Sequence, residues 1–176
     1  GKIASGVQLV TTDAQSNTVA GTNAGDSFTG TDAGGNTFYG YNAGTAVTTA
    51  DNLCAFGYEA LMTSDTEHYN HAFGYKALRV ADGGRFNTAV GWQCMLDLTT
   101  GDNNTGIGHE ALANNTTADN NTAIGSSTLI ANTTGAANTA IGWTALDANT
   151  TASDNTAVGG EALSGTTTGA SNTALG

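Results

Sequence analysis

A glycine returns at a fixed interval of 17 residues along most of this 176-residue chain. Each of these glycines closes a block that reads Asn, Thr, a small residue and a large apolar residue. The series consists of Gly40, Gly57, Gly74, Gly91, Gly108, Gly125, Gly142, Gly159 and Gly176. Gly21 precedes Gly40 by 19 residues and closes a degenerate first copy. So short a unit cannot bury its apolar side chains alone, so the period predicts stacked repeats.

Every position of the repeat has its own residue type. Asn stands four residues before the glycine in each copy except the one that has Leu53. Thr follows in most copies, with Cys54 and His71 as exceptions, and then come a small residue and a large apolar one. The large apolar position holds Tyr39, Phe56, Phe73, Val90, Ile107, Ile124, Ile141, Val158 and Leu175. An Ala-Leu pair commonly lies three and four residues after the glycine, before a polar Asn/Thr/Gly turn.

These positions predict an all-β fold, a β-helix or β-roll solenoid with 17-residue coils. The Asn-Thr-small-apolar block reads as a short strand, in which the Thr and apolar positions share one face and the Asn and small positions share the other. The glycine permits a corner at positive φ, and the polar run turns the chain back. Strands stacked at ~4.8 Å make nine copies a rod roughly 43 Å long, in which Asn ladders satisfy their amides.

The expected burial within one coil is small. The Ala-Leu pair supplies an inward apolar contact, but the alanine face of the strand is flat, which suggests close approach of another chain. We therefore expect a homotrimeric fibre, with the chains intertwined or side by side. The alternative is a monomeric solenoid, and the sequence does not decide which strand face meets a partner.

The chain divides into two predicted regions. Residues 1–35 depart from the repeat and read as an N-terminal cap or junction that holds the degenerate copy. Residues 36–176 form the solenoid shaft. Solenoids need caps at exposed ends, which fits a distinct N-terminal segment.

One block carries a family resemblance. It reads Asn138-Thr139-Ala140-Ile141-Gly142-Trp143-Thr144-Ala145-Leu146. It resembles the 17-residue NTAxGxxAL…NTTG repeats of bacteriophage tail fibres, and it is similar to the NSVAIG repeat in the heads of trimeric autotransporter adhesins. The resemblance covers about residues 36–176 and implies a trimeric shaft on a virion or cell surface, in which a C-terminal intramolecular chaperone domain often follows and is removed. It supplies no catalytic residues.

Composition excludes several classes of function. The net charge is −11, from 15 acidic and 4 basic residues, which makes the chain a poor partner for nucleic acid. No apolar run approaches 18 residues, so no segment is predicted to enter a membrane. No phosphate-binding loop or nucleophile motif is present, and we expect neither enzyme activity nor a cofactor.

The position just after the glycine is mostly aromatic: Tyr41, Tyr58, Tyr75, Trp92, His109 and Trp143. Stacking aligns these side chains along one line of the rod. Exposed aromatic rings there are candidate contacts for sugar rings. The alternative is packing at a corner of the coil.

A mixed-charge segment lies at 65–86. It contains three of the four basic residues, Lys76, Arg79 and Arg85, and forms a candidate receptor contact on an otherwise acidic rod. The alternative is a solvated face with local ion pairs, which contribute little energy.

His71 and the cysteines are weaker candidates. His71 takes a Thr position, and three copies of it on a threefold axis could bind a metal ion through nitrogen. Cys54 and Cys94 lie in different coils, too far apart for a disulfide, and are interpreted as small buried thiols.

Together these features predict a structural and adhesive segment of a viral tail fibre. It attaches to the bacterial host surface by multivalent contact with surface polysaccharide or another receptor, on the virion or otherwise at a cell surface. The alternatives are the head of a bacterial trimeric adhesin, a polysaccharide depolymerase using Glu59, Glu110 and Glu161, and an ice-binding solenoid. Ice binding rests on ladders of adjacent threonines: Thr99-Thr100, Thr116-Thr117, Thr133-Thr134, Thr150-Thr151 and Thr167-Thr168.

Overall fold

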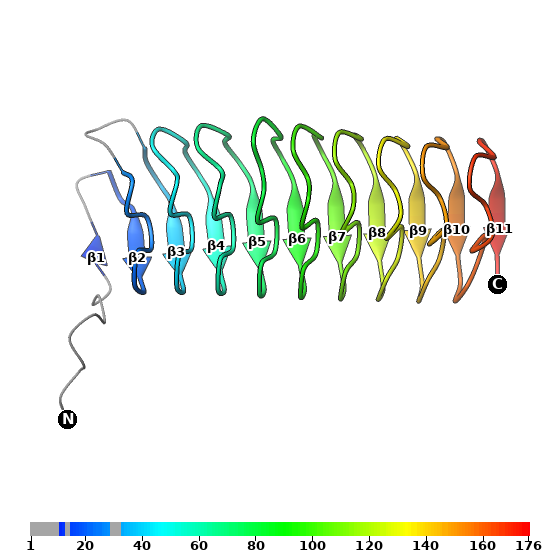
Figure 1. Ribbon diagram of the computed structural model, residues 1–176, viewed down its shortest axis with the longest axis horizontal. Helices are drawn as coiled ribbons and strands as arrows, with labels where there is room; N and C mark the ends of the chain where they lie inside the picture. The colour runs from blue at the N-terminus through cyan, green and yellow to red at the C-terminus, as the bar shows by residue number, and fades with distance from the viewer. Residues whose placement is uncertain (1–10, 13–14, 29–32) are drawn as a thin grey trace, which may run out of the picture.

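The computed structural model describes residues 11–12, 15–28 and 33–176, and it forms a straight stack of coils (Figure 1). Each coil contributes one short strand to a single sheet. The strands are β1 (Thr11–Thr12), β2 (Thr18–Ala20), β3 (Thr37–Tyr39), β4 (Cys54–Phe56), β5 (His71–Phe73), β6 (Thr88–Val90), β7 (Thr105–Ile107), β8 (Thr122–Ile124), β9 (Thr139–Ile141), β10 (Thr156–Val158) and β11 (Thr173–Leu175). The described residues contain no helix.

The sheet is parallel from β2 to β11, and its strands lie in chain order. From β3 onward, neighbouring strands pair in a register of one repeat, so that Thr122 lies opposite Thr139 and Ala123 opposite Ala140. Equivalent residues of successive repeats therefore form straight ladders. The predicted all-β solenoid with 17-residue coils is confirmed.

The core of each coil is built from the small residue at the strand centre and the residues after the corner. Ala123 is fully buried, as are Leu129 and Leu112, and all three belong to one apolar cluster. In the first coil of the shaft, the large and the small side chain exchange positions. Phe38 fills the strand centre, and Gly44 replaces the leucine, since a Cβ at Gly44 would collide with the Phe38 ring. The strand centre and the position after the corner thus share the interior between one large and one small side chain.

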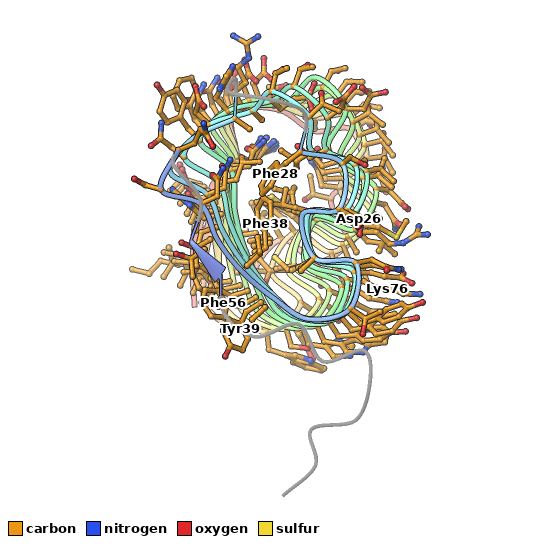
Figure 2. All side chains as sticks on the ribbon, turned by 90° about the vertical axis from the view of Figure 1, so that its left-hand side faces the viewer. Asp26, Phe28, Phe38, Tyr39, Phe56 and Lys76 are labelled. Atoms are coloured by element: carbon orange, nitrogen blue, oxygen red, sulfur yellow. The ribbon has the colours of Figure 1, made fainter. Side chains whose placement is uncertain are left out.

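This packing corrects the expectation for the alanine face. Ala123 and Ala140 do not form a flat outer surface that can meet another chain, because the coil's own leucines cover them. The large apolar position points outward instead, as Figure 2 shows for Tyr39 and Phe56, while Phe38 points into the coil. A strand has only two faces, and a narrow coil accepts the smaller residues on its inner one.

The repeated glycine makes a corner that no other residue fits. Its φ lies between +131° and +144° from Gly21 to Gly159. A Cβ at Gly108 would strike the carbonyl group of Gly125, the equivalent glycine in the next coil. Positive φ, expected from the sequence, is therefore only half of the reason for glycine. Close stacking of successive corners is the other half.

A ladder of buried asparagines lies beside the alanines. The side-chain amide of Asn104 donates to the Ala118 carbonyl at 2.8 Å, and its oxygen accepts from the backbone nitrogen of Asn121 at 2.9 Å. The same pair of bonds recurs along the shaft. The prediction that stacked asparagines satisfy one another is confirmed.

The N-terminal region joins the sheet through two strands. β1 pairs antiparallel with β2, and β2 pairs in parallel with β3, so the degenerate copy is part of the stack. The predicted cap or junction at 1–35 includes residues 1–10, 13–14 and 29–32, which lie outside the described residues.

Candidate functional site

The outward side of the parallel sheet carries a continuous apolar ladder. Phe56, Phe73 and Ile124 are each more than one third exposed, and the Tyr39, Phe56 and Phe73 rings stack at 5.6 and 5.5 Å between centroids. Beside this ladder runs a half-buried ladder made mostly of strand threonines such as Thr122. Strands β2 to β11 contain no Asp, Glu, Lys or Arg. The strands of this face therefore carry no acidic, lysine or arginine side chain, in a chain of net charge −11.

The aromatic side chains after the glycines stack along the rod, as predicted. Ring centroids are 5.1 Å apart for Tyr41 and Tyr58, 5.3 Å for Tyr58 and Tyr75, 5.9 Å for Tyr75 and Trp92, and 4.7 Å for Trp92 and His109. The planes of neighbouring rings differ by at most 14°. Rings in such a ladder cover one another's faces and leave mainly their edges to solvent. Their stacking alone therefore does not make an open platform for sugars along its whole length.

Trp143 differs from the other members of this position. The equivalent residues in the adjacent coils are Ser126 and Gly160, neither of which has a ring. The side chain of Trp143 is 58% exposed, against 41% for Trp92 inside the ladder. A Cβ at Gly160 would meet no atom within 4 Å. Of the aromatic candidates predicted for sugar contact, Trp143 has faces that no neighbouring ring covers.

Two of the three predicted basic residues belong to one ion-pair cluster. The carboxylate of Glu59 lies 3.6 Å from Lys76 Nζ and accepts a hydrogen bond from Arg79 Nε at 3.1 Å. Desolvation raises the pKa of Glu59, but hydrogen bonds from Tyr58 and Arg79 and the charges of Lys76 and Arg79 outweigh it and hold the pKa below its ordinary value. The positive charge of these two residues is thus partly neutralised within the chain.

Arg85 does not join that cluster. It lies at the corner before β6, where its backbone nitrogen donates to Asp102 at 2.7 Å, whereas Lys76 follows the far end of β5. Next to Arg85 in sequence, Phe86 stacks on Tyr69 at 5.1 Å, and both rings are about half exposed. This exposed aromatic pair is not among the predicted contacts, although the sequence contains a signal for it. Two aromatic residues 17 apart interrupt a position that is otherwise mostly small or polar.

The metal candidate His71 and the nearby His68 have different surroundings. His71 begins β5 on the outward side, half-buried, whereas His68 accepts a hydrogen bond from the Asp51 backbone nitrogen at 2.8 Å. Within the described residues, no three His, Cys, Asp or Glu side chains gather to hold a metal ion. A shared site on a threefold axis needs other chains and stays a prediction.

The cysteines are free thiols with different environments. Cys94 is fully buried, as predicted, while Cys54 on β4 is half-buried. Burial raises the pKa of both thiols, that of Cys94 to about 12. A Cβ on Gly106 would lie 2.6 Å from Cys94 Sγ, which explains why this coil has glycine where the others mostly have alanine.

Two of the alternative functions, the depolymerase and ice binding by the turn threonines, fit the structure less well. Glu59 and Glu110 are three coils apart, or ~14 Å, which is beyond the ~5–9.5 Å that separates paired catalytic carboxylates. In the turns, the hydroxyls of Thr99, Thr116 and Thr133 donate to carbonyls of the next coil at 2.9, 3.1 and 3.0 Å. These threonines are therefore parts of the turn ladder, not free donors.

In the part of the chain that the structure describes, no helix has the length and apolarity needed to cross a membrane. Compared with family models, curated proteins and solved structures, the chain matches none of them.

Proposed function

We propose that this chain is a structural and adhesive segment of a viral tail fibre. It acts as a homotrimer and attaches the particle to the bacterial surface through several weak contacts with surface glycans. Its place is the virion. The head of a bacterial trimeric adhesin is the nearest alternative, and a membrane anchor encoded downstream in the gene would favour that alternative.

The observation that carries the proposal is the charge-free apolar ladder on the outer face of the sheet. Three residues per strand at ~3.3 Å and nine strands at ~4.8 Å give this face an area of about 430 Å². The apolar ladder takes about half of this face and the threonine ladder takes the rest, and a contiguous apolar patch on a monomer is often functional. Leaving it in water forfeits the free energy that burial of Phe56, Ile124 and their equivalents provides.

A second copy of the same chain is the partner that fits this face best. Its ladder has the same 17-residue period, so each apolar side chain of one copy meets an equivalent one of the next copy along the whole rod. Acidic residues such as Glu110 and Asp119 lie outside the strands, so copies can approach through the sheet without bringing carboxylates together. An acidic chain of this kind repels other copies at most of its remaining surface.

Adhesion then follows from multivalency. Three chains present three sets of exposed rings, and several fibres per particle multiply them. Weak contacts that act together raise the avidity by orders of magnitude over one contact. No strong single binding site is required.

The test compares two double variants by light scattering after size exclusion. Ile124→Asp with Ile141→Asp places two carboxylates on the outer face of β8 and β9, and we expect it to convert a trimer to monomers that keep the β-sheet circular dichroism spectrum. The control, Thr117→Asp with Thr134→Asp, adds the same charge at exposed turn positions and should leave the trimer intact. A native chain with a mass near 17.5 kDa contradicts the proposal, and so does a trimer that survives the first variant.

Ice binding is the second candidate, because the strand threonines form a regular outward ladder beside Ile and Val. Thr88, Thr105, Thr122, Thr139 and Thr156 make up its regular part. A monomeric chain that shows thermal hysteresis in ice-growth measurements favours this function over the fibre. A trimer without thermal hysteresis excludes it.

A further inference from the structure

The aromatic ladder has one missing ring, and its neighbours on both sides are aromatic. His109 ends the continuous stack, Ser126 follows it one coil later, and Trp143 follows one coil after that. The backbone is the same at all three positions: the His109 carbonyl accepts from Ser127 at 2.8 Å, that of Ser126 from Thr144 at 3.0 Å, and that of Trp143 from Glu161 at 2.8 Å. The interruption therefore comes from the side chain alone.

We propose that a single pyranose ring of the host polysaccharide binds above Ser126 and takes the place of the missing ring, between His109 and Trp143. This inference rests on the proposed glycan attachment and gives it a specific site. The proposed ligand is a hexose whose ring carries C–H groups on both faces.

The spacing of the coils fits such a ligand. Two coil steps separate His109 from Trp143 by ~9.6 Å, so a ring midway is ~4.8 Å from each. That distance matches the 4.7 Å between Trp92 and His109 and lies within the range of ~4.5–7 Å for stacked rings. A ligand ring thus continues the existing pitch without any movement of the backbone.

The chemistry of the two walls selects the sugar. Aromatic faces are negatively polarised and attract the positively polarised C–H groups of a pyranose. With an aromatic wall on each side, the favoured ring has all its hydroxyl groups equatorial, which leaves C–H groups on both faces, as in β-glucose. The equatorial hydroxyls then point along the surface, where Glu110 lies beside His109 with its carboxylate 3.4 Å from Nδ1 and can accept hydrogen bonds.

The same reasoning explains why the rest of the ladder is a poorer site. Each ring from Tyr58 to Trp92 already has an aromatic neighbour on both faces. A sugar there could contact ring edges only. The exposure of Trp143, 58%, marks the place where a face is open.

The experiment titrates methyl β-D-glucopyranoside into the native chain and follows the indole N–H signal of Trp143 by NMR. That signal is assigned with Trp143→Phe. We expect a dissociation constant in the millimolar range, as befits one small ring on an open surface. Methyl β-D-galactopyranoside, with an axial hydroxyl on one face, should bind at least ~3-fold more weakly, and equal affinity would overturn the two-walled site.

Two matched variants locate the ring. Ser126→Tyr completes the ladder and should weaken binding at least ~10-fold, while Gly160→Tyr covers the opposite face of Trp143 and should change it less than ~2-fold. Gly160 has ordinary negative φ and open space around it, so both variants are expected to fold. Binding that survives Ser126→Tyr overturns the inference, as does binding that is lost only in Gly160→Tyr.

Failure of this site and failure of the proposed function are distinguishable. A chain that is trimeric and attaches to bacterial cells, but whose Trp143 signal does not shift with tens of millimolar probe, overturns the sugar site alone. A monomeric chain that binds the probe with the expected variant pattern supports the sugar site and overturns the trimeric fibre.

Discussion

The side-chain oxygen of Asn121 accepts a hydrogen bond from the backbone nitrogen of Asn138 at 2.9 Å, one coil further along the chain. The same side chain donates through Nδ2 to the Gly135 carbonyl at 2.9 Å. Asn121 thus satisfies buried backbone groups at two places that no strand pairing reaches. In a chain with few large apolar residues, this ladder supplies order where a conventional core is missing.

Replacing one member of the ladder should destabilise the solenoid strongly. Asn121→Ala leaves the Asn138 N–H buried without its partner. It also removes one of the two hydrogen bonds to the Gly135 carbonyl, which keeps the bond from Asn132 Nδ2. We expect a cost of about 1–3 kcal/mol. The urea midpoint, measured by circular dichroism, should fall accordingly. The control Asn114→Ala changes an exposed asparagine outside the left-handed region, at a position where Ala131 already occurs, and should have little effect. Equal midpoints for the two variants would contradict the role of the ladder.

The close stacking of the glycine corners predicts that two glycine-to-alanine variants differ in stability. Gly108→Ala forces a Cβ onto the carbonyl of Gly125 at a φ of +144° and should cost at least ~2 kcal/mol, seen as a lower thermal midpoint. Gly160→Ala, at ordinary φ and with open space around it, should be neutral or stabilise by ~0.4–1 kcal/mol. A Gly108→Ala protein as stable as Gly160→Ala would show that the corners are not closely stacked.

The buried thiol of Cys94 predicts a pH dependence. Its pKa of about 12 in the folded chain lies above the model-compound value of 9.0, so the folded state favours the neutral thiol. This contribution to stability is complete below pH 9 and is lost as the pH rises toward 12. Cys94→Ala, which installs the usual residue of that position, should therefore lose less stability between pH 8 and about 11 than the native chain, in paired thermal melts.

Alkylation gives an independent readout of the same thiol. Iodoacetamide should leave Cys94 unmodified until the chain unfolds, whereas it should modify half-buried Cys54 once the outer face of the sheet is free, as in the Ile124→Asp with Ile141→Asp variant. Mass spectrometry of peptides identifies the modified residue. Rapid labelling of Cys94 under native conditions would contradict its burial.

Much of the fold could be predicted because the repeat removes ambiguity. A single copy of Asn-Thr-Ala-Ile-Gly is too short to define a strand. The fixed interval, however, places each strand threonine opposite the equivalent one in the next coil, as Thr122 lies opposite Thr139. Positive φ at the glycine and bonding between stacked asparagines follow from residue type and period together. These are local or nearest-neighbour properties, which repetition makes visible.

The candidate site was less predictable. Tyr58 and Tyr75 were expected to align, but only the 5.3 Å stacking of their rings shows that they cover one another's faces. Lys76 and Arg85 are nine residues apart in sequence, yet Lys76 follows β5 and Arg85 precedes β6, so they lie at different corners of the coil. Side-chain direction around a closed coil depends on the turn at each corner, which spacing alone does not give.

The period, the strand, the glycine corner and the asparagine ladder all follow from the sequence, because each depends on residues that repeat in register. Which side of the strand faces inward follows from the closure of the coil. Alternation assigns Ala123 and Ile124 to opposite faces, but the width of the closed coil, already occupied by Leu129, leaves room inside for the alanine alone. Ile124 and its equivalents are therefore displayed on the surface, where their burial requires a partner.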